Sequence, residues 1–290
     1  MNTTARGDGF AVTFHGVRGS TPCHAPELVR YGGNTSCVSL DIGGAHPILF
    51  DLGTGLRYFG NTLVPGARFV GTCLLSHLHW DHIQGLPFFA PLLQEGSDVT
   101  MYGPRQEGDA TLASVFADTI CPPLFPVELA MLPGDIDFVD CWESSFQVTT
   151  TSTLVDIMSR PIPHVGNTLG YRVSAHGRSV AYLSDHQMPV DGRPAMSPAA
   201  RELCAGADLI IHDAQYTPSE FALKSNWGHC TIEYAVWVAA ESGAKRLALF
   251  HHDPSHDDDT LDQLAAEAAE CGREFGVEVF AAREGHTIEV

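Results

Sequence analysis

The sequence has little positive charge: sixteen lysines and arginines stand against 35 aspartates and glutamates, which gives a formal net charge of -19. That balance disfavours a protein that follows a long nucleic acid, unless basic residues or bound cations reverse the sign locally. Long apolar segments are missing as well, because no uncharged run approaches the roughly 18 residues that span a bilayer. The start, MNTTARGDGF, has no apolar stretch of the kind found in secretion signals. We therefore expect a cytoplasmic protein that does not associate with membranes or long nucleic acids.

Cysteine pairs of the C-x-x-C type are also missing, although the chain has eight cysteines. Their spacing favours neither a thiolate zinc site nor a dense disulfide framework, and it is typical of reduced thiols. No fixed-period repeat and no glycine-serine linker interrupts the 290 residues, of which 44% are apolar. A chain of this length and composition can bury a sizeable core. We therefore expect a single domain over residues 1–290.

Short apolar runs between glycine-containing turns predict the strands. In the first quarter of the chain, runs at 10–14, 36–42 and 48–51 have the pattern of a meander. Strand and helix patterns then alternate, and several strands are continuously apolar, as in strands that are covered on both faces. The later strands are predicted at 72–75, 98–102, 146–154, 169–174, 179–183, 209–212, 247–250 and 277–280. The whole pattern predicts an α/β protein.

Apolar residues spaced i, i+3, i+4 predict helices over 232–240 and 261–268, and the stretch 106–118 also has a helical pattern. Thr231 is a suitable start for one helix through its capping oxygen. The acidic run Asp257–Asp259 suits the start of the next through the helix dipole. We therefore interpret this acidic run as a helix entrance rather than a cation site.

Histidine is over-represented, with fifteen in 290 residues, and imidazole is a common metal ligand. The strongest chemical pattern is His77-Leu78-His79-Trp80-Asp81-His82, directly after an apolar strand. In an extended chain, residues two apart project to the same side, so His77 and His79 can bind one ion. Asp81 and His82, where the chain turns, can face a second ion. The alternative makes Asp81 a helix cap and the histidines surface residues.

Two ions need more ligands than one loop supplies, so we expect further histidines and aspartates at the ends of later strands. His164 follows a strand within PIPHVGNT, Asp185 ends the run VAYLSD, and His251-His252 ends the run LALF. Each of them alone could be an ordinary polar residue at a strand end. Because they occur together and in this order, we predict that they are metal ligands.

The sequence resembles the metallo-β-lactamase superfamily, specifically its phosphodiesterase branch that includes tRNase Z, from Gly19-Ser20 and Asn34-Thr35-Ser36 through Phe50-Asp51-Leu52-Gly53 to the last metal motif. The resemblance implies a four-layer αβ/βα sandwich with metals in a cleft at strand ends. It also implies ligands for two divalent ions, namely His77, His79 and His164 on one, Asp81, His82 and His251 on the other, and Asp185 bridging both. Asp81 is counted among the catalytic residues as well, and His252 stays open as an alternative to His251. Imidazole and carboxylate ligands without thiolates suit zinc, our default, and also manganese or iron.

A second motif bears on the reaction. The stretch Leu209–Tyr216, followed by Gly228-His229-Cys230-Thr231, is similar to the H-E-A-T-F and H-S-T pair of tRNase Z, with Asp213 in the glutamate position. In that branch the carboxylate orients a histidine that protonates the leaving oxygen, which implies these roles for Asp213 and His229. A phosphodiester needs such an acid because its leaving alkoxide is a strong base, and positioned proton transfer contributes about 10²- to 10⁴-fold. Alternatively, Asp213 and His229 are ordinary strand-end and loop residues.

The expected mechanism follows from the charges. Two cations about 3.5 to 4 Å apart lower the pKa of a bridging water from about 15.7 toward neutrality and neutralise the phosphate oxygens. The resulting hydroxide is then expected to attack phosphorus while His229 protonates the leaving oxygen.

The chain lacks a long glycine- and lysine-rich insertion like the arm with which tRNase Z holds tRNA, so processing of precursor tRNA is disfavoured. We expect a hydrolase of a small phosphodiester, with a cyclic nucleotide such as 3',5'-cAMP as the leading substrate. The alternatives are a thioesterase or lactonase of the same fold, a tRNase Z-like endoribonuclease, and a metal-containing ligand sensor without catalysis. The proline-rich segment Ile120–Gly134 favours an ordered loop over a helix. We predict that it caps the cleft or contacts a second subunit, in keeping with a homodimer.

Overall fold

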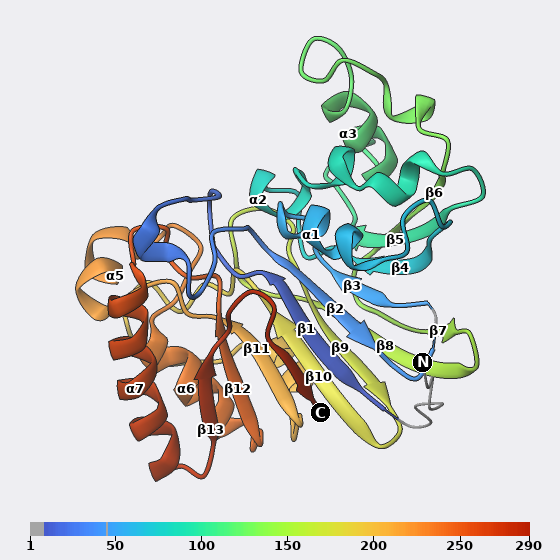
Figure 1. The fold of residues 1–290 in the computed structure, drawn as a ribbon. Helices are drawn as coiled ribbons and strands as arrows, with labels where there is room; N and C mark the ends of the chain where they lie inside the picture. The colour runs from blue at the N-terminus through green and yellow to red at the C-terminus, as the bar shows by residue number, and fades with distance from the viewer. Residues whose placement is uncertain (1–8, 45) are drawn as a thin grey trace.

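The apolar runs of the sequence form two mixed sheets in the computed structural model, which describes residues 9–44 and 46–290 (Figure 1). Most of the N-terminal segment MNTTARGDGF, which has no apolar stretch typical of a secretion signal, lies outside the described residues. The first seven-stranded sheet runs, in spatial order, β14 (Thr287–Glu289), β1 (Ala11–Gly16), β2 (Cys37–Asp41), β3 (Ile48–Phe50), β4 (Val70–Leu74), β5 (Asp98–Pro104) and β6 (Asp135–Cys141). The second runs β13 (Glu278–Ala281), β12 (Arg246–Phe250), β11 (Leu209–Asp213), β10 (Arg178–Leu183), β9 (Leu169–Ala175), β8 (Thr153–Pro161) and β7 (Ser144–Thr150).

The two sheets lie face to face, and helices cover their outer faces (Figure 1). The α-helices of the described chain are α1 (Gly55–Thr62), α2 (Trp80–Ile83), α3 (Leu112–Thr119), α4 (Pro198–Cys204), α5 (Pro218–Lys224), α6 (Ile232–Glu241) and α7 (Asp258–Glu274). Helices α1 and α3 contact strands of the first sheet, and α4, α6 and α7 contact strands of the second. This arrangement confirms the predicted αβ/βα sandwich. No helix in the described residues has both the length and the apolar character that crossing a membrane requires.

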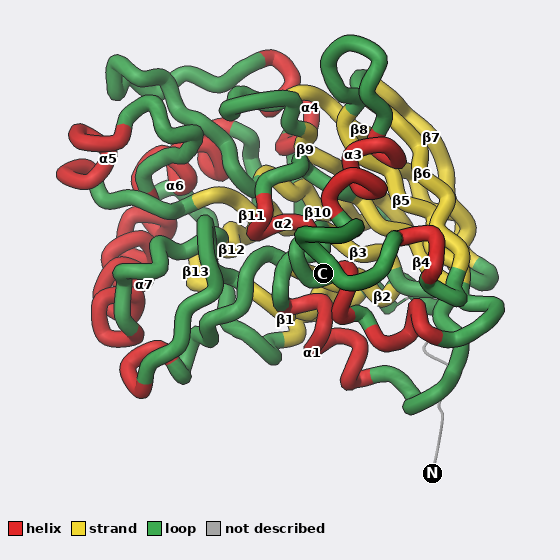
Figure 2. The backbone as a smooth tube through the Cα atoms, turned by 90° about the horizontal axis from the view of Figure 1, so that it is seen from above, coloured by secondary structure: helices red, strands yellow, loops and turns green. Residues whose placement is uncertain are grey.

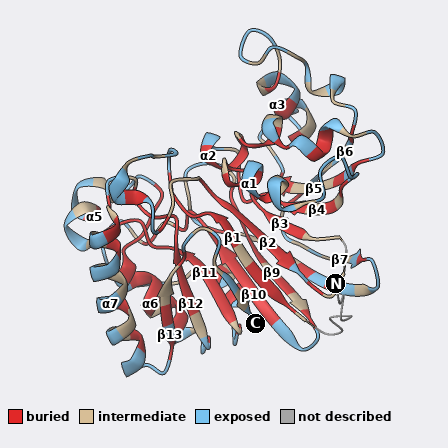
Figure 3. Ribbon diagram, viewed as in Figure 1, coloured by how far each residue is buried: buried red, intermediate tan, exposed pale blue. Residues whose placement is uncertain are grey.

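Three hydrophobic clusters hold the layers together. The cluster between the sheets contains Phe50 of β3 and Tyr182 of β10, whose rings stack with centroids 4.5 Å apart. The second cluster joins the second sheet to its helices, and the third joins the first sheet to α1 and α3. Figure 3 shows the resulting pattern of buried strands between more exposed helices. Because the central strands of both sheets are packed on both faces, their ends are held in fixed positions.

The helix starts agree with the capping patterns of the sequence. Thr231 caps α6 by accepting a hydrogen bond from the backbone N–H of Tyr234. Asp257 caps α7 by accepting one from the backbone N–H of Thr260, which confirms that the acidic run is a helix entrance. The prediction for 106–118 was wrong at its start, because α3 begins only at Leu112. Gly108 has a φ of +65°, which a right-handed helix cannot contain.

One predicted strand is wrong in a larger way. The run 146–154 is not a single strand but spans the turn of the hairpin between β7 and β8, which pair in antiparallel register. Thr151 lies in this turn with a φ of 38°. The meander predicted for the first quarter is confirmed, since β1, β2 and β3 pair in sequence and antiparallel.

Parallel strands bring the chemically active loops to one end of the sandwich. Strands β3 to β6 are parallel in the first sheet, and strands β10 to β13 are parallel in the second. Figure 2 looks onto the loop-covered end and shows α2 between α3 and the helices α5, α6 and α7. Open α/β sheets bind ligands beyond the carboxyl ends of their strands, so a ligand site is expected at this end of the sandwich.

Candidate metal centre and active site

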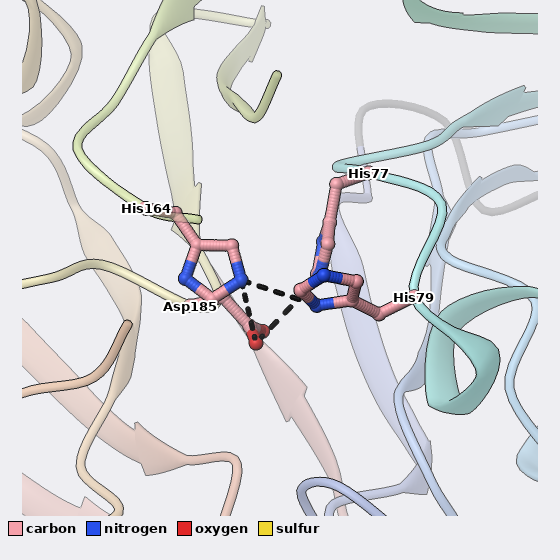
Figure 4. A group of neighbouring side chains, drawn as sticks. All are labelled: His77, His79, His164 and Asp185. Atoms are coloured by element: carbon pink, nitrogen blue, oxygen red, sulfur yellow. Dashed lines mark hydrogen bonds and ion pairs between the residues drawn. The ribbon is translucent and has the colours of Figure 1, made fainter. Parts of the chain in front are cut away.

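Four side chains converge from three loops to form the first cluster. His77 and His79 follow β4, His164 follows β8, and Asp185 follows β10. Figure 4 shows the two rings of the β4 loop on one side and His164 on the other, all directed toward the Asp185 carboxylate. The nitrogens His79 Nδ1 and His164 Nε2 are 3.3 Å apart, and Asp185 Oδ1 lies 3.7 Å from Nε2 of both His77 and His164. Four ligand atoms therefore surround one small space.

The hydrogen bonds around these rings leave the inward nitrogens free. His164 Nδ1 lies 2.7 Å from the carbonyl oxygen of Gly228, so this nitrogen carries the proton and Nε2 presents its lone pair. His77 Nδ1 lies 3.0 Å from Ser76 Oγ, while its buried Nε2 has no hydrogen-bond partner. A buried polar nitrogen without a partner is costly, and metal binding would satisfy it.

The second cluster lies beside the first. Asp81 and His82 belong to α2, and His251 directly follows β12. The Nε2 atoms of His82 and His251 are 3.3 Å apart, and Asp81 Oδ2 lies 3.3 Å from the former and 3.1 Å from the latter. Asp81 also accepts a hydrogen bond of 2.7 Å from the backbone N–H of Ser20.

Asp185 stands between the two clusters. Its Oδ1 faces the first cluster, and its Oδ2 lies 3.1 Å from His82 Nε2 and 3.2 Å from His251 Nε2. Both Asp185, with φ of 57°, and His251, with φ of 60°, adopt the left-handed backbone conformation that non-glycine residues seldom use. Strain of this kind persists where the surrounding structure fixes it, as it often does at functional sites.

These distances and charges fit divalent cations. Two nitrogens bound at about 2.0–2.1 Å to one tetrahedral ion lie about 3.4 Å apart, close to the 3.3 Å separations in both clusters. Burial disfavours the charged form of Asp185, but the imidazoles around it, His251 and His82 foremost, hold its pKa well below the ordinary value. The same balance lowers the pKa of Asp81, where His82 is the main opposing charge. Buried carboxylates that remain charged are paired with a positively charged group or bind a metal ion.

Residues beyond these clusters orient the candidate ligands. His82 Nδ1 lies 2.7 Å from Asp51 Oδ2, and this carboxylate also accepts hydrogen bonds from the hydroxyls of Ser76 and Tyr182. A carboxylate behind a metal-binding histidine fixes the tautomer and orientation of the ring. The sequence motif contained Asp51, but no role could be assigned to it from the pattern.

The structure separates His251 from its neighbour. His251 Nε2 points into the second cluster, and its Nδ1 lies 2.9 Å from Gln215 Oε1. His252 points away, with Nε2 2.9 Å from the carbonyl oxygen of Ala282, and it belongs to neither cluster. Gln215 is the second orienting residue that the sequence pattern did not reveal.

The predicted acid pair is assembled at the edge of the clusters. His229 Nδ1 lies 2.7 Å from Asp213 Oδ2, and the two side chains are 8% and 0% exposed. Burial opposes a charge on His229, but Asp213 outweighs it and raises the pKa of the imidazole above its ordinary value. His229 Nδ1 is also 3.8 Å from Asp185 Oδ1, so the pair lies next to the candidate metal ligands.

His229 and His212 differ in their relation to the candidate metal ligands. His229 forms a third group with Asp185 and His251 that could hold a metal ion. Its Nδ1 is already committed to Asp213, which leaves Nε2 for a ligand or a substrate. His212, which belongs to the second motif, instead forms a buried pair with His186 at 2.8 Å and lies in none of the three groups.

A cavity of about 680 Å³ opens above the clusters, and its wall includes His79, Asp81, Asp185 and His229. Small-molecule sites commonly have volumes of about 300–1,000 Å³. A neighbouring cavity of about 490 Å³ is lined in part by the proline-rich segment 120–134. Trp80 belongs to the walls of both cavities.

The chain is similar to known proteins in sequence and in fold. Ribonuclease Z from Streptococcus sanguinis (strain SK36) is 25% identical over 252 residues, which cover 70% of this chain and 78% of that protein. The crystal structure of the metallo-β-lactamase-fold protein YhfI from Bacillus subtilis has a TM-score of 0.71 at 21% identity, with coverage of 98% of this chain and 100% of YhfI. A diphosphatase of the PhnP family has a TM-score of 0.67 at 17% identity, with coverage of 97% and 98%.

The two solved structures show a shared fold. Their sequence identities of 21% and 17% are too low to show a shared function. The family model for the beta-lactamase superfamily domain matches residues 46–252, which include all nine candidate site residues. With a match over more than half of its length, the chain belongs to the beta-lactamase superfamily.

Proposed function

We propose that this protein is a phosphodiesterase with two divalent metal ions that hydrolyses a small phosphodiester, with a cyclic nucleotide such as 3',5'-cAMP as the leading substrate. Family membership makes it a metal-dependent hydrolase. The observation that carries the finer proposal is the buried contact of 2.7 Å between His229 and Asp213, placed 3.8 Å from Asp185. A phosphodiester requires an acid for its leaving alkoxide, and this pair supplies one beside the metal ligands.

The ligand assignment follows the two clusters. His77, His79 and His164 would hold one ion, Asp81, His82 and His251 would hold the other, and Asp185, whose two oxygens face the two clusters, would be shared between them. Two such ions, when bound, supply a water of lowered pKa and neutralise charge on the phosphate oxygens. Zinc is our default, because imidazole and carboxylate ligands suit it, and manganese and iron are the alternatives.

The protein's own residues then handle the leaving group. His229 Nδ1 donates a hydrogen bond to Asp213, which leaves Nε2 of this cavity-lining ring for the substrate and favours the charged imidazole. His229 gives its Nε2 proton to the leaving oxygen as the P–O bond breaks, and the ring becomes neutral. Gln215 donates its backbone N–H to Asp213 Oδ1 at 3.0 Å, so the carboxylate is held from both sides.

The size of the cavity and the charge of the chain support a small substrate. A volume of about 680 Å³ accommodates a nucleotide, and the formal net charge of -19 opposes a long polyanion. The ribonuclease Z relative favours a second candidate, an endoribonuclease acting on RNA. A hydrolysis screen that includes precursor tRNA separates the two.

We also propose that the proline-rich segment 120–134 caps the cleft or contacts a second subunit. Residues 120–134 contain a single-turn 3-10 helix and no α-helix, and Leu124 and Met131 are 68% and 67% exposed. Exposed apolar side chains of this size favour a contact with another molecule, and a homodimer is the simplest one. Light scattering should give twice the monomer mass, and limited proteolysis should spare the segment; a monomer cleaved freely within 120–134 contradicts both roles.

The test of the proposed function is a metal analysis combined with a hydrolysis screen. Purified protein is loaded with zinc or manganese, its metal content is measured, and it is assayed on cyclic mononucleotides, cyclic dinucleotides, linear diesters, precursor tRNA, thioesters and lactones. We expect two ions per chain and the highest kcat/KM on a cyclic mononucleotide. A preference for thioesters or lactones, or for precursor tRNA, would replace this proposal with one of those activities. Binding of nucleotides without turnover would indicate a ligand sensor.

A further inference from the structure

The tryptophans of this chain are distributed unevenly. Of the four, Trp142 and Trp237 pack against the hydrophobic clusters. Trp80 and Trp227 are 59% and 61% exposed, and both line the cavity of about 680 Å³ above the metal clusters. The two tryptophans that the core does not use therefore occupy the wall of the same cavity.

Such exposure needs an explanation, because tryptophan has one of the largest apolar surfaces to bury, about 150–250 Å². Exposed aromatic side chains in a concave site commonly serve as anchors for a ligand. Both residues are also attached directly to the site. Trp80 lies between His79 and Asp81, and Trp227 precedes Gly228-His229. Their backbones are therefore held beside the candidate site residues.

Lys224 contacts both the backbone and the ring of Trp227. Its backbone N–H donates to the carbonyl oxygen of Lys224, and the Lys224 ammonium lies 5.7 Å from its ring centroid and 4.8 Å from that of Tyr216. Lys224 is one of two lysines in the chain. Among the described residues that line the cavity of about 680 Å³ it is also the one lysine or arginine, and it forms an ion pair of 3.4 Å with Asp253. Because this cation already has a partner, the outer wall offers aromatic faces rather than a strong anion site.

We propose that Trp80 and Trp227 form a nucleobase platform, on which the base of a nucleoside phosphodiester stacks while its phosphodiester lies against Asp185 and His229. This inference rests on the proposed function and names its substrate class. Stacking on indole tolerates any base, because every base has a π-face. The platform therefore favours nucleotides over diesters without a planar group, with little discrimination among bases.

The test compares ligands with and without a base on the zinc-loaded protein. Isothermal titration calorimetry measures the affinity for adenosine 5'-monophosphate and for ribose 5-phosphate, which keeps the sugar and phosphate but has no base. We expect Trp227→Leu and Trp80→Leu to weaken binding of the nucleotide by roughly fivefold to a hundredfold and to leave ribose 5-phosphate unchanged. Trp227→Phe and Trp80→Phe, which keep an aromatic face, should recover part of the loss.

A matched control is Phe275→Leu, because Phe275 is 59% exposed and lies at the end of α7, away from the cavity lining. It should change neither affinity. Metal content is measured in every variant, and where Trp80→Leu loses metal or fails to fold, the Trp227 pair decides. Equal affinity of the unmodified protein for the two ligands, or nucleotide affinity that is unaltered in the Trp227 pair, overturns the platform.

The binding and hydrolysis measurements distinguish a failure of the platform from a failure of the proposed function. If the protein hydrolyses diesters but binds both ligands equally, the platform fails and the phosphodiesterase stands. If it hydrolyses none of the diesters but its affinity for the nucleotide depends on the two tryptophans, the platform stands and the phosphodiesterase fails.

Discussion

Replacement of His229 by alanine tests the acid role, because the variant removes the proton donor and leaves the seven proposed metal ligands intact. Positioned proton transfer contributes about 10²- to 10⁴-fold, so kcat on a diester with an alkoxide leaving group should fall by about that factor. On bis-p-nitrophenyl phosphate, whose leaving group needs little protonation, the loss should be about threefold or less. The ratio of the two losses therefore measures the acid directly.

Asp213→Asn tests how much of the acid effect depends on the charge of the carboxylate. In the unmodified protein, His229 Nδ1 lies 2.7 Å from the Asp213 carboxylate. The asparagine keeps a side-chain oxygen at this place, but it removes the negative charge that raises the pKa of the imidazole. The variant should therefore lose most of the acid effect on the alkoxide substrate. Since the two residues act as one unit, the double variant should be no slower than His229→Ala alone.

The assay measures kcat for both substrates under saturating zinc, together with the metal content of each variant. His256→Ala is a matched control, because His256 is 5% exposed and its Nε2 lies 2.8 Å from Glu220 Oε1, a similar imidazole–carboxylate pair away from the cavity lining. It should change both rates by less than about twofold. Equal losses on the two leaving groups in His229→Ala would refute the acid role. Loss of one ion would instead identify His229 as a metal ligand.

Three further variants probe the ligands, their support and the fold. His251→Ala should lower the metal content from two ions toward one, whereas His252→Ala should keep both ions and lower the free energy of unfolding; elemental analysis and urea titration separate the two, and the opposite pattern would reassign the last ligand. Asp51→Asn, which suits the left-handed φ of 55° at this position, should weaken metal affinity about 10- to 100-fold in a chelator competition, and unchanged affinity contradicts its orienting role. Burial lowers the pKa of His15 from 6.5 to about 4, so protonation on acidification destabilises the folded state through this pH window. In metal-free protein, His15→Leu should remove about 3 kcal/mol of the loss in unfolding free energy between pH 6.5 and 4, and an unaltered pH dependence refutes that assignment.

Much of the candidate site was predictable because its residues occupy strand ends. The spacing of His77, His79 and Asp81 needed no tertiary information, since it depends on one loop. His164 and Asp185 are far away in sequence, and they could be predicted because each follows the end of a strand. Asp185 follows β10 of the parallel set, whereas His164 follows β8, which pairs antiparallel with both of its neighbours. The structure brings all of these side chains together. Their metal-binding roles remain predictions until an ion is measured.

The parts that the sequence did not reveal depend on backbone direction and on contacts between distant loops. His251 and His252 are adjacent and chemically identical, and the φ of 60° at His251 is what turns one ring inward. In the sequence, Asp51 is one of many acidic residues, and no pattern assigns it a role. Its role depends on the packing of β3 against α2, which places it behind His82. The hairpin within 146–154 was missed for a similar reason, because its turn has no glycine or asparagine to mark it.

The acidic character of the chain and the chemistry of its site have a common physical basis. Asp51, Asp81 and Asp185 bring three carboxylates into the buried centre. Among the described residues that line the cavity of about 680 Å³, the one lysine or arginine is Lys224, which is paired with Asp253. The positive charge that attracts a phosphodiester must therefore come from bound ions, which act over a short range because salt screens charges beyond about 8 Å. A substrate with one phosphodiester can place all of its charge within that range. A long polyanion would hold most of its phosphates against an acidic surface, so we expect affinity to fall as phosphates are added to the substrate.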